Sequence, residues 1–542
     1  MPDRGKHDHH FSTDHLKSDL RGRSVRAGAI TVFTQFSRFA LNTGTTMVLA
    51  RMLVPEDFGL VAMLMAIVMF VEMFRDMGLS SATVQRATIT HEQVSTLFWI
   101  NILFSLLVGG LIFAAAPYLA AFYEEDRLTN IARALAVMFA IGGMNAQHSA
   151  LLTRQMRFRA QGIVTIIAMT LSSVGAITIA YYARQHGAGY WAVVAQYLIQ
   201  AVVMTVGMWI ASGWMPGLPR RDADVGPMLR YGINFALFGF INSFSRSMDS
   251  VLIGWKLGPA AVGLYSKAYQ LVLMPVMQIN TPLGRVAMPA LSRLQNEPER
   301  YRRFYVNAVG ITTFLGMPII AFLFVAAESA IDLLLGHQWI DAVPLFRILG
   351  PAAFFGTFNV ATGWVYTSLG TTNRQLKWGL FSSGLTVIGF FIGLKYGGAE
   401  GVAAAFSIVY CGINLGVPGL MYCYRGTPLR LRDAIEALWR PMVTSIAAGI
   451  ALYLLTHFVF TPPVHALPSL LVQGVLYGLL YVLAWVCLPN GRKRLMDIVD
   501  HVKSMKAQKN AKNAVPVVDG ASDTATGVKS ANSGAEPVGA VV

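Results

Sequence analysis

Two pairs of polar residues lie inside apolar stretches, where such side chains need a chemical reason. Arg38 and Asn42 stand four residues apart in one stretch, and Asn242 and Arg246 stand four apart in another. Residues four apart share one face of a helix. An arginine inside a bilayer costs at least about 2.5 kcal/mol and is expected to face a cavity or a partner. Guanidinium groups bind phosphate through two hydrogen bonds and keep their charge, so the pairs predict a cationic site for a phosphate or pyrophosphate group.

The charged neighbours of these pairs leave a structural alternative open. Asp249 follows Arg246 by three residues, so the two side chains could neutralise each other on one helix face. Arg38 has no acidic residue three or four positions away, which favours a cavity role for it. Lys267 is a further basic candidate in the next apolar stretch.

The elements that must position these residues are predicted membrane spans. Hydrophobic residues make up 54% of the 542, charged residues only 13%, and the mean hydropathy is +0.51. A soluble protein of this length needs more charge to cover its surface. A run of about 20 apolar residues crosses a ~30 Å hydrocarbon core. Fourteen such runs are predicted, at 28–50, 59–79, 94–116, 128–149, 161–183, 190–212, 230–253, 264–285, 305–327, 344–369, 377–395, 401–423, 441–460 and 468–488.

The charges of the connecting loops predict the orientation of the spans. Most of the 43 lysines and arginines fall in the loops of one side and in the two terminal segments, whereas the opposite loops carry acidic residues. The rule that positive loops stay inside places both termini in the cytoplasm. The net charge of +15 follows from this topology, so membrane lipids are expected partners and nucleic acid is not.

One short loop occurs twice in the sequence. LVPEDFGL at 53–60 returns as LGPAAVGL at 257–264, with four identities and no gap. Six predicted spans separate the copies, so both loops are expected on the same, non-cytoplasmic side. A parallel duplication of a six-helix lobe explains this pattern. The same offset aligns Arg38 with Asn242 and Asn42 with Arg246.

The duplication predicts the domain organisation. The expected parts are a polar cytoplasmic segment at 1–27, an N-lobe at 28–212, a C-lobe at 230–423, two extra spans within 441–488, and a cytoplasmic tail at 489–542 that is first basic and then disordered.

Catalysis and metal binding are not predicted. Glu56 and Asp57 in the first loop are placed like the catalytic acids of membrane glycosyltransferases that use lipid-linked donors. Their counterparts are alanines in the second copy, and no connecting loop exceeds about 20 residues, so the shared role of the loop is a turn. A metal site in the polar N-terminal segment is the alternative to a solvated tail, on the residues His7, His9, His10 and His15. Small buried residues, not disulfide partners or metal ligands, are expected at Cys411, Cys423 and Cys487.

Several segments are similar to one transporter family. The segment 244–295, FSRSMDSVLIGWKLGPAAVGLYSKAYQLVLMPVMQINTPLGRVAMPALSRLQ, resembles the polysaccharide-transporter branch of the multidrug/oligosaccharidyl-lipid/polysaccharide (MOP) exporter superfamily. The segments LARMLVPEDFGLVAM, FRDMGLSSATVQR and LLTRQMRFRA show the same resemblance, which extends over roughly residues 28–490 and is nearest to the Wzx-type flippases. It implies an all-α polytopic membrane protein, with about 14 transmembrane helices in two pseudo-symmetric bundles around a central cationic cavity, as in MATE transporters.

The resemblance also implies a function and roles for the polar residues. Members of the branch move undecaprenyl-pyrophosphate-linked oligosaccharide repeat units across the bacterial inner membrane, by alternating access. On this resemblance, Arg38 and Arg246 hold the pyrophosphate, Lys267 is a further candidate, and Asn42 and Asn242 line the polar cavity.

The sugar and the coupling ion would contact other residues. Tyr265, Tyr269, Trp255 and Trp364 could stack on sugar rings, and the alternative for each is an interfacial or packing role. Asp249 could exchange a proton or Na⁺, or balance the charge of Arg246. Ion coupling, not ATP, is expected, because the sequence contains no GxxxxGK[ST] phosphate loop and predicts no bound cofactor.

Expected partners are the lipid-linked oligosaccharide, membrane lipids, and the polymerase and export machinery of polysaccharide synthesis. Two other classes stay open. A drug or small-molecule antiporter of a sister family is one, and a membrane polymerase or glycosyltransferase is the other.

Overall fold

The computed structural model describes residues 20–76, 78–86, 88–220, 226–459, 465–489 and 491–492. Of residues 20–27, 29, 70–76 and 226–246 it describes only the backbone. The chain divides into two compact units, residues 1–484 and 485–542, and the helices considered below belong to the first unit, apart from the last residues of α16. Within the described ranges all regular structure is helical, which confirms the predicted all-α class.

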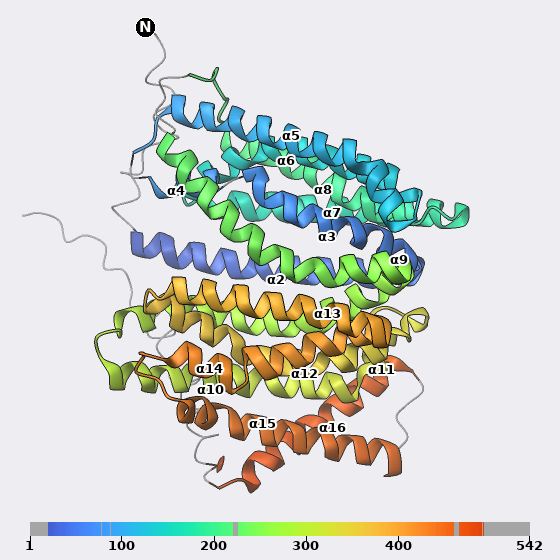
Figure 1. The fold of residues 1–542 in the computed structure, drawn as a ribbon, viewed down its shortest axis with the longest axis vertical. Coiled ribbons are helices and arrows are strands. Elements are labelled where there is room, and N and C mark those ends of the chain that lie inside the picture. The colour runs from blue at the N-terminus through green and yellow to red at the C-terminus, as the bar shows by residue number, and fades with distance from the viewer. Residues whose placement is uncertain are drawn as a thin grey trace, which may run out of the picture. The chain divides into compact units, whose positions relative to one another are not determined.

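The first helices form one bundle. They are α2 (Leu20–Met52), α3 (Pro55–Asp76), α4 (Leu79–Gln85), α5 (His91–Tyr123), α6 (Arg127–Arg154), α7 (Phe158–Ala183), the short η2 (Arg184–His186) and α8 (Tyr190–Ser212). Neighbouring pairs pack closely, α5 on α6 and α7 on α8, and α2 lies on α7 (Figure 1). A capping box starts α5, because Thr90 Oγ1 accepts from Gln93 N and Gln93 Oε1 accepts from Thr90 N, both at 3.2 Å.

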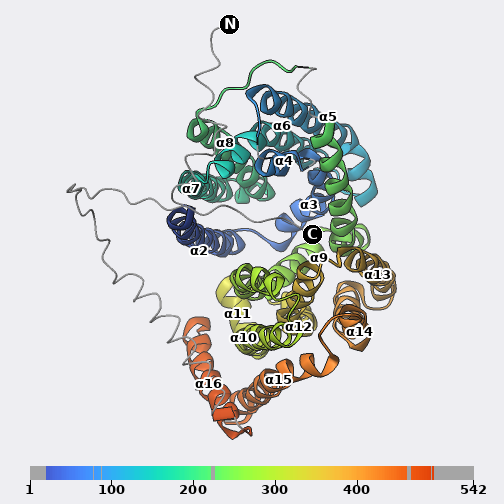
Figure 2. The same ribbon diagram turned by 90° about the vertical axis from the view of Figure 1, so that its left-hand side faces the viewer.

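The remaining helices form a second bundle. They are α9 (Gly226–Arg293), α10 (Pro298–Val325), α11 (Ala327–Leu334), η3 (His337–Trp339), α12 (Ala342–Ser368), α13 (Thr372–Val409), η4 (Tyr410–Asn414), α14 (Val417–Tyr424), α15 (Leu431–Leu454), η5 (Leu455–Val459) and α16 (Ala466–Cys487). The helices α10, α12 and α13 pack around α9, and α15 packs on α10. Figures 1 and 2 show α9 reaching both bundles, and its most extensive packing is against α3.

Glycines break the two longest helices. Gly258 in α9 has φ 79° and ψ −177°, a conformation that L-residues rarely adopt. The break falls in the second copy of the repeated loop and separates the predicted spans 230–253 and 264–285. Gly397 and Gly398, the latter with φ 57°, break α13 between the predicted spans 377–395 and 401–423. Each helix therefore changes direction where the sequence predicts a loop.

Nine helical segments of the described residues are long and apolar enough to cross a membrane. They are His91–Tyr123, Arg127–Arg154, Phe158–His186, Tyr190–Ser212, Pro298–Val325, Ala342–Ser368, Thr372–Asn414, Leu431–Val459 and Ala466–Cys487. The chain is thus a multi-pass membrane protein, and the total of fourteen spans stays a prediction. The segment Leu431–Val459 begins ten residues before the predicted span 441–460, because Arg430 and Asp433 form a capping arrangement ahead of the apolar run.

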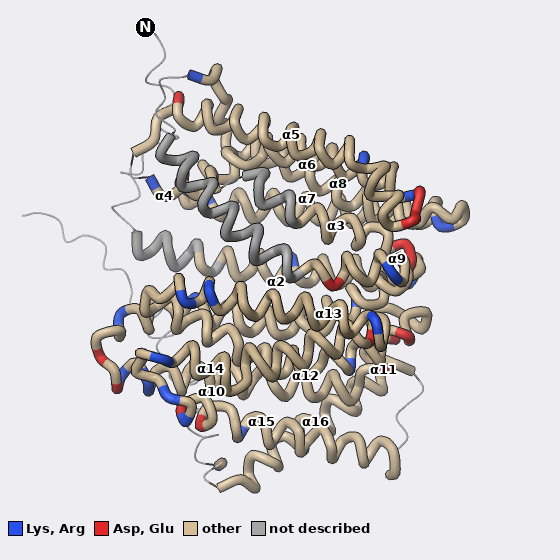
Figure 3. The backbone as a smooth tube through the Cα atoms, in the orientation of Figure 1, with Lys and Arg blue, Asp and Glu red and all other residues tan. Residues whose placement is uncertain are grey.

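The two ends of the bundles differ in charge. Lys and Arg gather at the left-hand ends of α10, α13 and α14 in Figure 3. This end, where α6 finishes at Arg154 and α10 starts at Pro298, is called the arginine-rich end below. The opposite end carries both copies of the repeated loop, 53–60 and 257–264, and is called the repeat end.

Candidate functional site

The repeat end holds a direct backbone contact between the two bundles. A Cβ atom on Gly59 of α3 would lie 1.7 Å from the carbonyl oxygen of Pro259, and a Cβ atom on Gly263 of α9 would lie 1.9 Å from that of Pro55. The same two residues of each repeat copy thus meet in exchanged roles, as in a contact across a two-fold axis. Only glycine permits this approach, so the shared residues of the repeat are those that join the bundles.

Side chains of the second bundle bind the end of α2. The last carbonyl groups of a helix have no partner within it. Gln338 Nε2 donates to the carbonyl oxygen of Leu53 at 2.8 Å and also to that of Ala50. Trp339, which is fully buried, donates its Nε1 hydrogen to the carbonyl oxygen of Ala50 at 2.8 Å. The carbonyl groups that end α2 are therefore satisfied by η3, across the boundary between the bundles.

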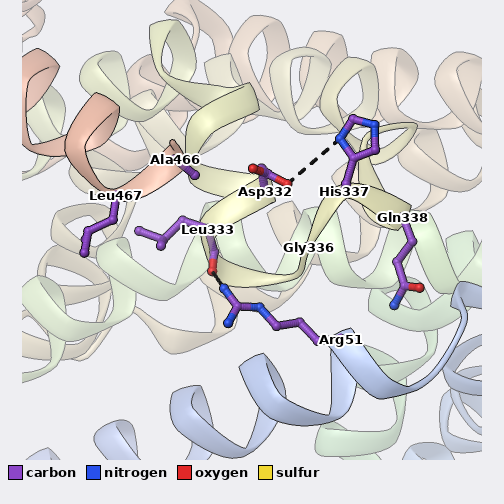
Figure 4. Close-up of a pocket in the computed structure, with 8 residues that line it drawn as sticks. All are labelled: Arg51, Asp332, Leu333, Gly336, His337, Gln338, Ala466 and Leu467. Carbon is purple, nitrogen blue, oxygen red and sulfur yellow. Dashed lines mark hydrogen bonds and ion pairs between the residues drawn. The ribbon is translucent and has the colours of Figure 1, made fainter. Parts of the chain in front are cut away.

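A pocket of about 550 Å³ lies beside this contact. Arg51 enters it from α2, and its Nη2 donates to the carbonyl oxygen of Leu333 at 2.7 Å (Figure 4). His337 and Asp332 line the opposite wall, with 4.0 Å between His337 Nδ1 and Asp332 Oδ1. The pocket therefore lies at the repeat end, whereas the predicted polar pairs lie elsewhere on α2 and α9.

Lys267 also lies at the boundary between the bundles. Its Nζ is 4.2 Å from the centre of the Phe58 ring on α3 and 3.3 Å from Gln270 Oε1. Phe58 in turn packs edge-on against Trp339, with 5.4 Å between ring centres. The ammonium of Lys267 thus has a cation–π contact with the first bundle, which adds to the closure of the repeat end.

Arg38 and Asn42 are exposed on α2. Arg38 forms no ion pair with any side chain that the structure describes. One side of α2 is fixed to α7 by Thr45, whose Oγ1 donates to Ser173 Oγ at 2.6 Å. On another side Thr43 Oγ1 lies 3.8 Å from Met274 Sδ of α9. The predicted pair on α2 is therefore exposed, on a helix that contacts the second bundle at Thr43.

The matching pair on α9 lies outside the described side chains. Asn242 and Arg246 belong to the part of α9 for which only the helical backbone is described. The predicted arrangement of the four polar residues therefore stays a prediction. So does the alternative in which Arg246 and Asp249 neutralise each other.

Asp249 of α9 is buried and only 4% exposed. Its Oδ1 accepts from Ser250 N at 2.6 Å, and its Oδ2 accepts from the Tyr265 hydroxyl at 2.8 Å. Tyr265, 1% exposed, stacks on the half-buried Tyr269 with 6.1 Å between ring centres. Tyr269 packs edge-on against Phe406. The structure thus brings together Asp249, Tyr265 and Tyr269, all of which the sequence predicts as site residues. Tyr265 is buried and is used for a hydrogen bond to Asp249 and for packing on Tyr269.

The two predicted tryptophans lie in different surroundings. Trp255 is 48% exposed and stacks on Phe122 of α5, with 6.2 Å between ring centres. Trp364 is 5% exposed and packs in a core of the second bundle, where its Nε1 would lie 3.2 Å from a Cβ on Gly284. Trp255 is thus partly exposed, with the Lys256 ammonium also 5.7 Å from its ring centre, whereas Trp364 is enclosed in this arrangement.

The acidic pair of the first loop copy belongs to the first bundle. Glu56 Oε1 and Glu125 Oε1 lie 2.5 Å and 2.7 Å from nitrogens of Arg127 at the start of α6. The hydrogen bond from Arg127 lowers the pKa of Glu125. Burial raises the pKa of Asp57, against the opposing effect of its hydrogen bond from Val54 N. These partners give the acidic residues a structural role.

A metal site and several contacts between the bundles complete the comparison with the sequence predictions. Among the described residues, no group of three His, Cys, Asp or Glu side chains could hold a metal ion. The cluster His7, His9, His10 and His15 lies outside the described residues. Arg51, Gln338 and Trp339 are not predicted from the sequence as contacts between the bundles. Their one available signal is the Gln-Trp pair in a predicted external loop.

Comparisons with known proteins point to one family. The sequence profile of the family described as "Polysaccharide biosynthesis protein" matches residues 48–344. The chain is 25% identical to the teichuronic acid biosynthesis protein TuaB of Bacillus subtilis, over 81% of this chain and 88% of that one. It is 22% identical to the lipopolysaccharide biosynthesis protein WzxC of Escherichia coli, over 75% and 82%. It is 25% identical to the succinoglycan biosynthesis transport protein ExoT of Rhizobium meliloti, over 88% and 94%.

Solved structures share the fold. The lipid II flippase MurJ in an inward closed conformation is similar with a TM-score of 0.68 and 15% identity, over 85% of this chain and 98% of that one. An inward-facing multidrug resistance MATE transporter of the MOP superfamily is similar with a TM-score of 0.57 and 16% identity, over 74% and 95%. The predicted architecture of two helical bundles is therefore confirmed.

Proposed function

Since the chain belongs to the polysaccharide biosynthesis protein family, we propose that it is a flippase for undecaprenyl-pyrophosphate-linked oligosaccharide repeat units. The family match and the transport name of the relative ExoT support a transporter in preference to an enzyme. The lipid II flippase named among the similar structures supports a lipid-linked sugar as cargo. The chain would move its cargo across the bacterial inner membrane for exopolysaccharide, capsule or O-antigen synthesis.

The observation that carries this proposal is the joining of the two bundles at the repeat end. Backbone contact at Gly59 and Gly263, and hydrogen bonds from η3 to α2, join them at the repeat end. In alternating access, one end must close while the other admits the cargo. We assign the repeat end to the periplasmic side, because the arginine-rich end has the charge of cytoplasmic loops. The structure then corresponds to a state closed towards the periplasm.

The cargo would enter from the cytoplasmic side with its sugar and pyrophosphate between the bundles and its lipid tail outside. A sugar head group is too polar to cross hydrocarbon unaided. Arg38 would bind the pyrophosphate from α2 and Arg246 from α9, with Asn42 and Asn242 as hydrogen-bonding neighbours. The exposure of Arg38 supports this role, because an intramembrane arginine is stable only against water, a partner or a ligand.

The remaining predicted contacts divide by their surroundings. Trp255 is 48% exposed and could contact a sugar ring. Lys267, Tyr265 and Tyr269 would meet the cargo only after the repeat end opens, and Trp364 only after its own bundle rearranges. We further propose that transport is coupled to H⁺ or Na⁺, with Asp249 as a candidate for charge exchange, and that polymerase and export proteins receive the product.

The experiment that tests the function locates single repeat units in cells that lack the protein. Intact cells and opened spheroplasts are probed with an impermeant glycan-specific reagent. Accumulation on the cytoplasmic face is the expected result, and it should be reversed by the wild-type chain and not by the R38A variant. Single units on the periplasmic face would refute the proposal. Normal polymer together with increased drug sensitivity would instead favour the small-molecule antiporter.

A further inference from the structure

A histidine is buried in an aromatic box inside the first bundle. His148 of α6 is 0% exposed. The centre of its ring lies 4.5 Å from that of Trp209 on α8, 5.1 Å from that of Trp214, and 5.9 Å from that of Phe98 on α5. A buried polar side chain in a membrane bundle is a candidate for function. No role in cargo binding or closure has been assigned to it above.

The hydrogen bonds of Ser212 define the state of this histidine. Ser212 Oγ lies 3.1 Å from the carbonyl oxygen of Trp209, which can only accept, so the single hydroxyl hydrogen is directed there. With the hydroxyl hydrogen in that bond, Ser212 Oγ accepts from His148 Nδ1, which lies 2.8 Å away. A neutral ring that carries its hydrogen on Nδ1 leaves Nε2 as an acceptor. Nε2 is buried and has no hydrogen-bond partner among the described residues.

The segment between the two bundles covers this box. Trp214 belongs to the stretch 213–220 after α8, and its Nε1 donates to His91 Nδ1 at 3.1 Å. Gly217 N donates to Ser95 Oγ at 3.0 Å. Gly217 also accepts from Trp99 Nε1 at 2.8 Å. This stretch leads to α9, so movement of the bundles relative to each other would pull on the residues that exclude water from His148.

The charges around His148 are few. On α5, His91 accepts from Trp214 and therefore carries its hydrogen on Nε2, and Glu92 forms an ion pair with Arg220 of the covering stretch. Arg154, six residues further along α6, donates to the carbonyl oxygens of Thr83 and Arg86.

The other helices that pack on α6 add little charge. α4 and α8 carry no Asp, Glu, Lys, Arg or His, α7 carries Arg159, and the described side chains of α3 place their acids at the far end, on the first loop copy. No described carboxylate faces His148.

We propose that Nε2 of His148 is a proton-binding site of the transport cycle, empty in this state and loaded when the stretch 213–220 moves away. This inference rests on the proposed flippase function and names its coupling ion as H⁺. The step transfers one proton from a hydronium ion to the Nε2 lone pair, leaves a water molecule, and breaks no bond of the protein. The indole faces of Trp209 and Trp214 would stabilise the imidazolium by cation–π contacts. Nδ1–H keeps its bond to Ser212 in both forms.

Tryptophan fluorescence provides a direct test, because an imidazolium in contact with an indole quenches it and a neutral imidazole does so less. The purified full chain in lipid nanodiscs is titrated between about pH 8 and 5. Wild type should lose fluorescence in a reversible transition. H148N, whose amide can still donate to Ser212, should lack that transition. H186N changes an exposed histidine and should keep it. A transition of equal amplitude in H148N would overturn the proposal.

Two further readouts separate failure of this site from failure of the proposed function. W209F keeps His148, removes one reporter and weakens one cation–π contact, so it should reduce the amplitude of the transition and shift its midpoint to lower pH, even if H148N does not fold. In vesicles that contain lipid-linked oligosaccharide, an imposed pH gradient should accelerate flipping by wild type and not by H148N. Equal acceleration in H148N would refute the site alone, whereas no flipping by wild type at any pH would refute the function.

Discussion

Placing a methyl group at the glycine contact should open the repeat end. In Gly59→Ala the new Cβ would lie 1.7 Å from the carbonyl oxygen of Pro259, where ordinary contacts begin at 3.4 Å. The shortfall of about 1.7 Å must be met by moving backbone, since no flexible side chain stands there. Overpacking of this kind costs about 1–3 kcal/mol. The closed state should therefore lose population about 5- to 150-fold relative to the open state, and Gly263→Ala should act in the same way.

Reaction of a buried thiol measures this population. Val262, 0% exposed, is adjacent to Gly263 and is replaced by cysteine in a chain without Cys411, Cys423 and Cys487. An impermeant maleimide should modify the V262C thiol faster in the G59A background by a factor in that range, and flipping should fall.

The matched control is Gly44→Ala on α2, because a Cβ at Gly44 has no neighbour within 4 Å. An A176C thiol, buried within the first bundle, should stay protected in both backgrounds, which excludes unfolding as the cause. Equal modification rates in the G59A and G44A backgrounds, together with normal flipping, would refute the assignment of this contact as a closure.

Substitutions at four further residues probe the site and the contacts that support it. Arg38→Ala should lower the flipping rate about 10- to 100-fold, the effect of losing a charge-assisted hydrogen bond of about 1.5–3 kcal/mol. Arg38→Lys should keep part of the wild-type rate, because lysine retains the charge but lacks the two-pronged geometry of arginine. Equal rates for both variants in the leaflet assay would contradict a pyrophosphate contact. Gln338→Leu removes a donor from two carbonyl groups at the end of α2 and should raise V262C modification several-fold; unchanged protection would mean that Trp339 alone suffices. Glu56→Gln should cost less than about 1 kcal/mol of unfolding free energy, because the ion pair of Glu56 with Arg127 is partly exposed. The variant should flip its cargo normally. A folded variant without flipping activity would support a catalytic role for Glu56. The hydrogen bond from Arg127 lowers the pKa of Glu125 in the folded protein. The ionised Glu125 therefore stabilises the fold above its unfolded pKa, and this stabilisation disappears as the pH falls through its folded pKa. Glu125→Gln should flatten the acid side of the melting-temperature profile.

Much of the architecture follows from local sequence patterns, and most of the site does not. Apolar runs and loop charges predict helices and their direction because both depend on the solvent around each segment. The breaks at Gly258 and Gly398 fall where turn residues interrupt apolar runs. The contacts of Gln338 could not be predicted in this way, because they depend on which carbonyl groups of α2 lie opposite a loop almost 290 residues away. His148 was likewise invisible, since a single histidine in an apolar run is usually a satisfied core residue.

The two copies of the repeated loop explain both what they share and what they do not. The shared Pro55, Gly59, Pro259 and Gly263 form the reciprocal contact, so a change in either copy would disturb both bundles at once. In the described part of the chain, the acidic residues of the first copy form their ion pair and hydrogen bonds within their own bundle, with Arg127 and backbone groups. Their counterparts in the second copy, Ala260 and Ala261, have side chains that form no ion pair or hydrogen bond. The predicted duplication of a lobe would account for this pattern, because residues in the reciprocal contact must be kept in both copies, whereas residues away from it are free to differ.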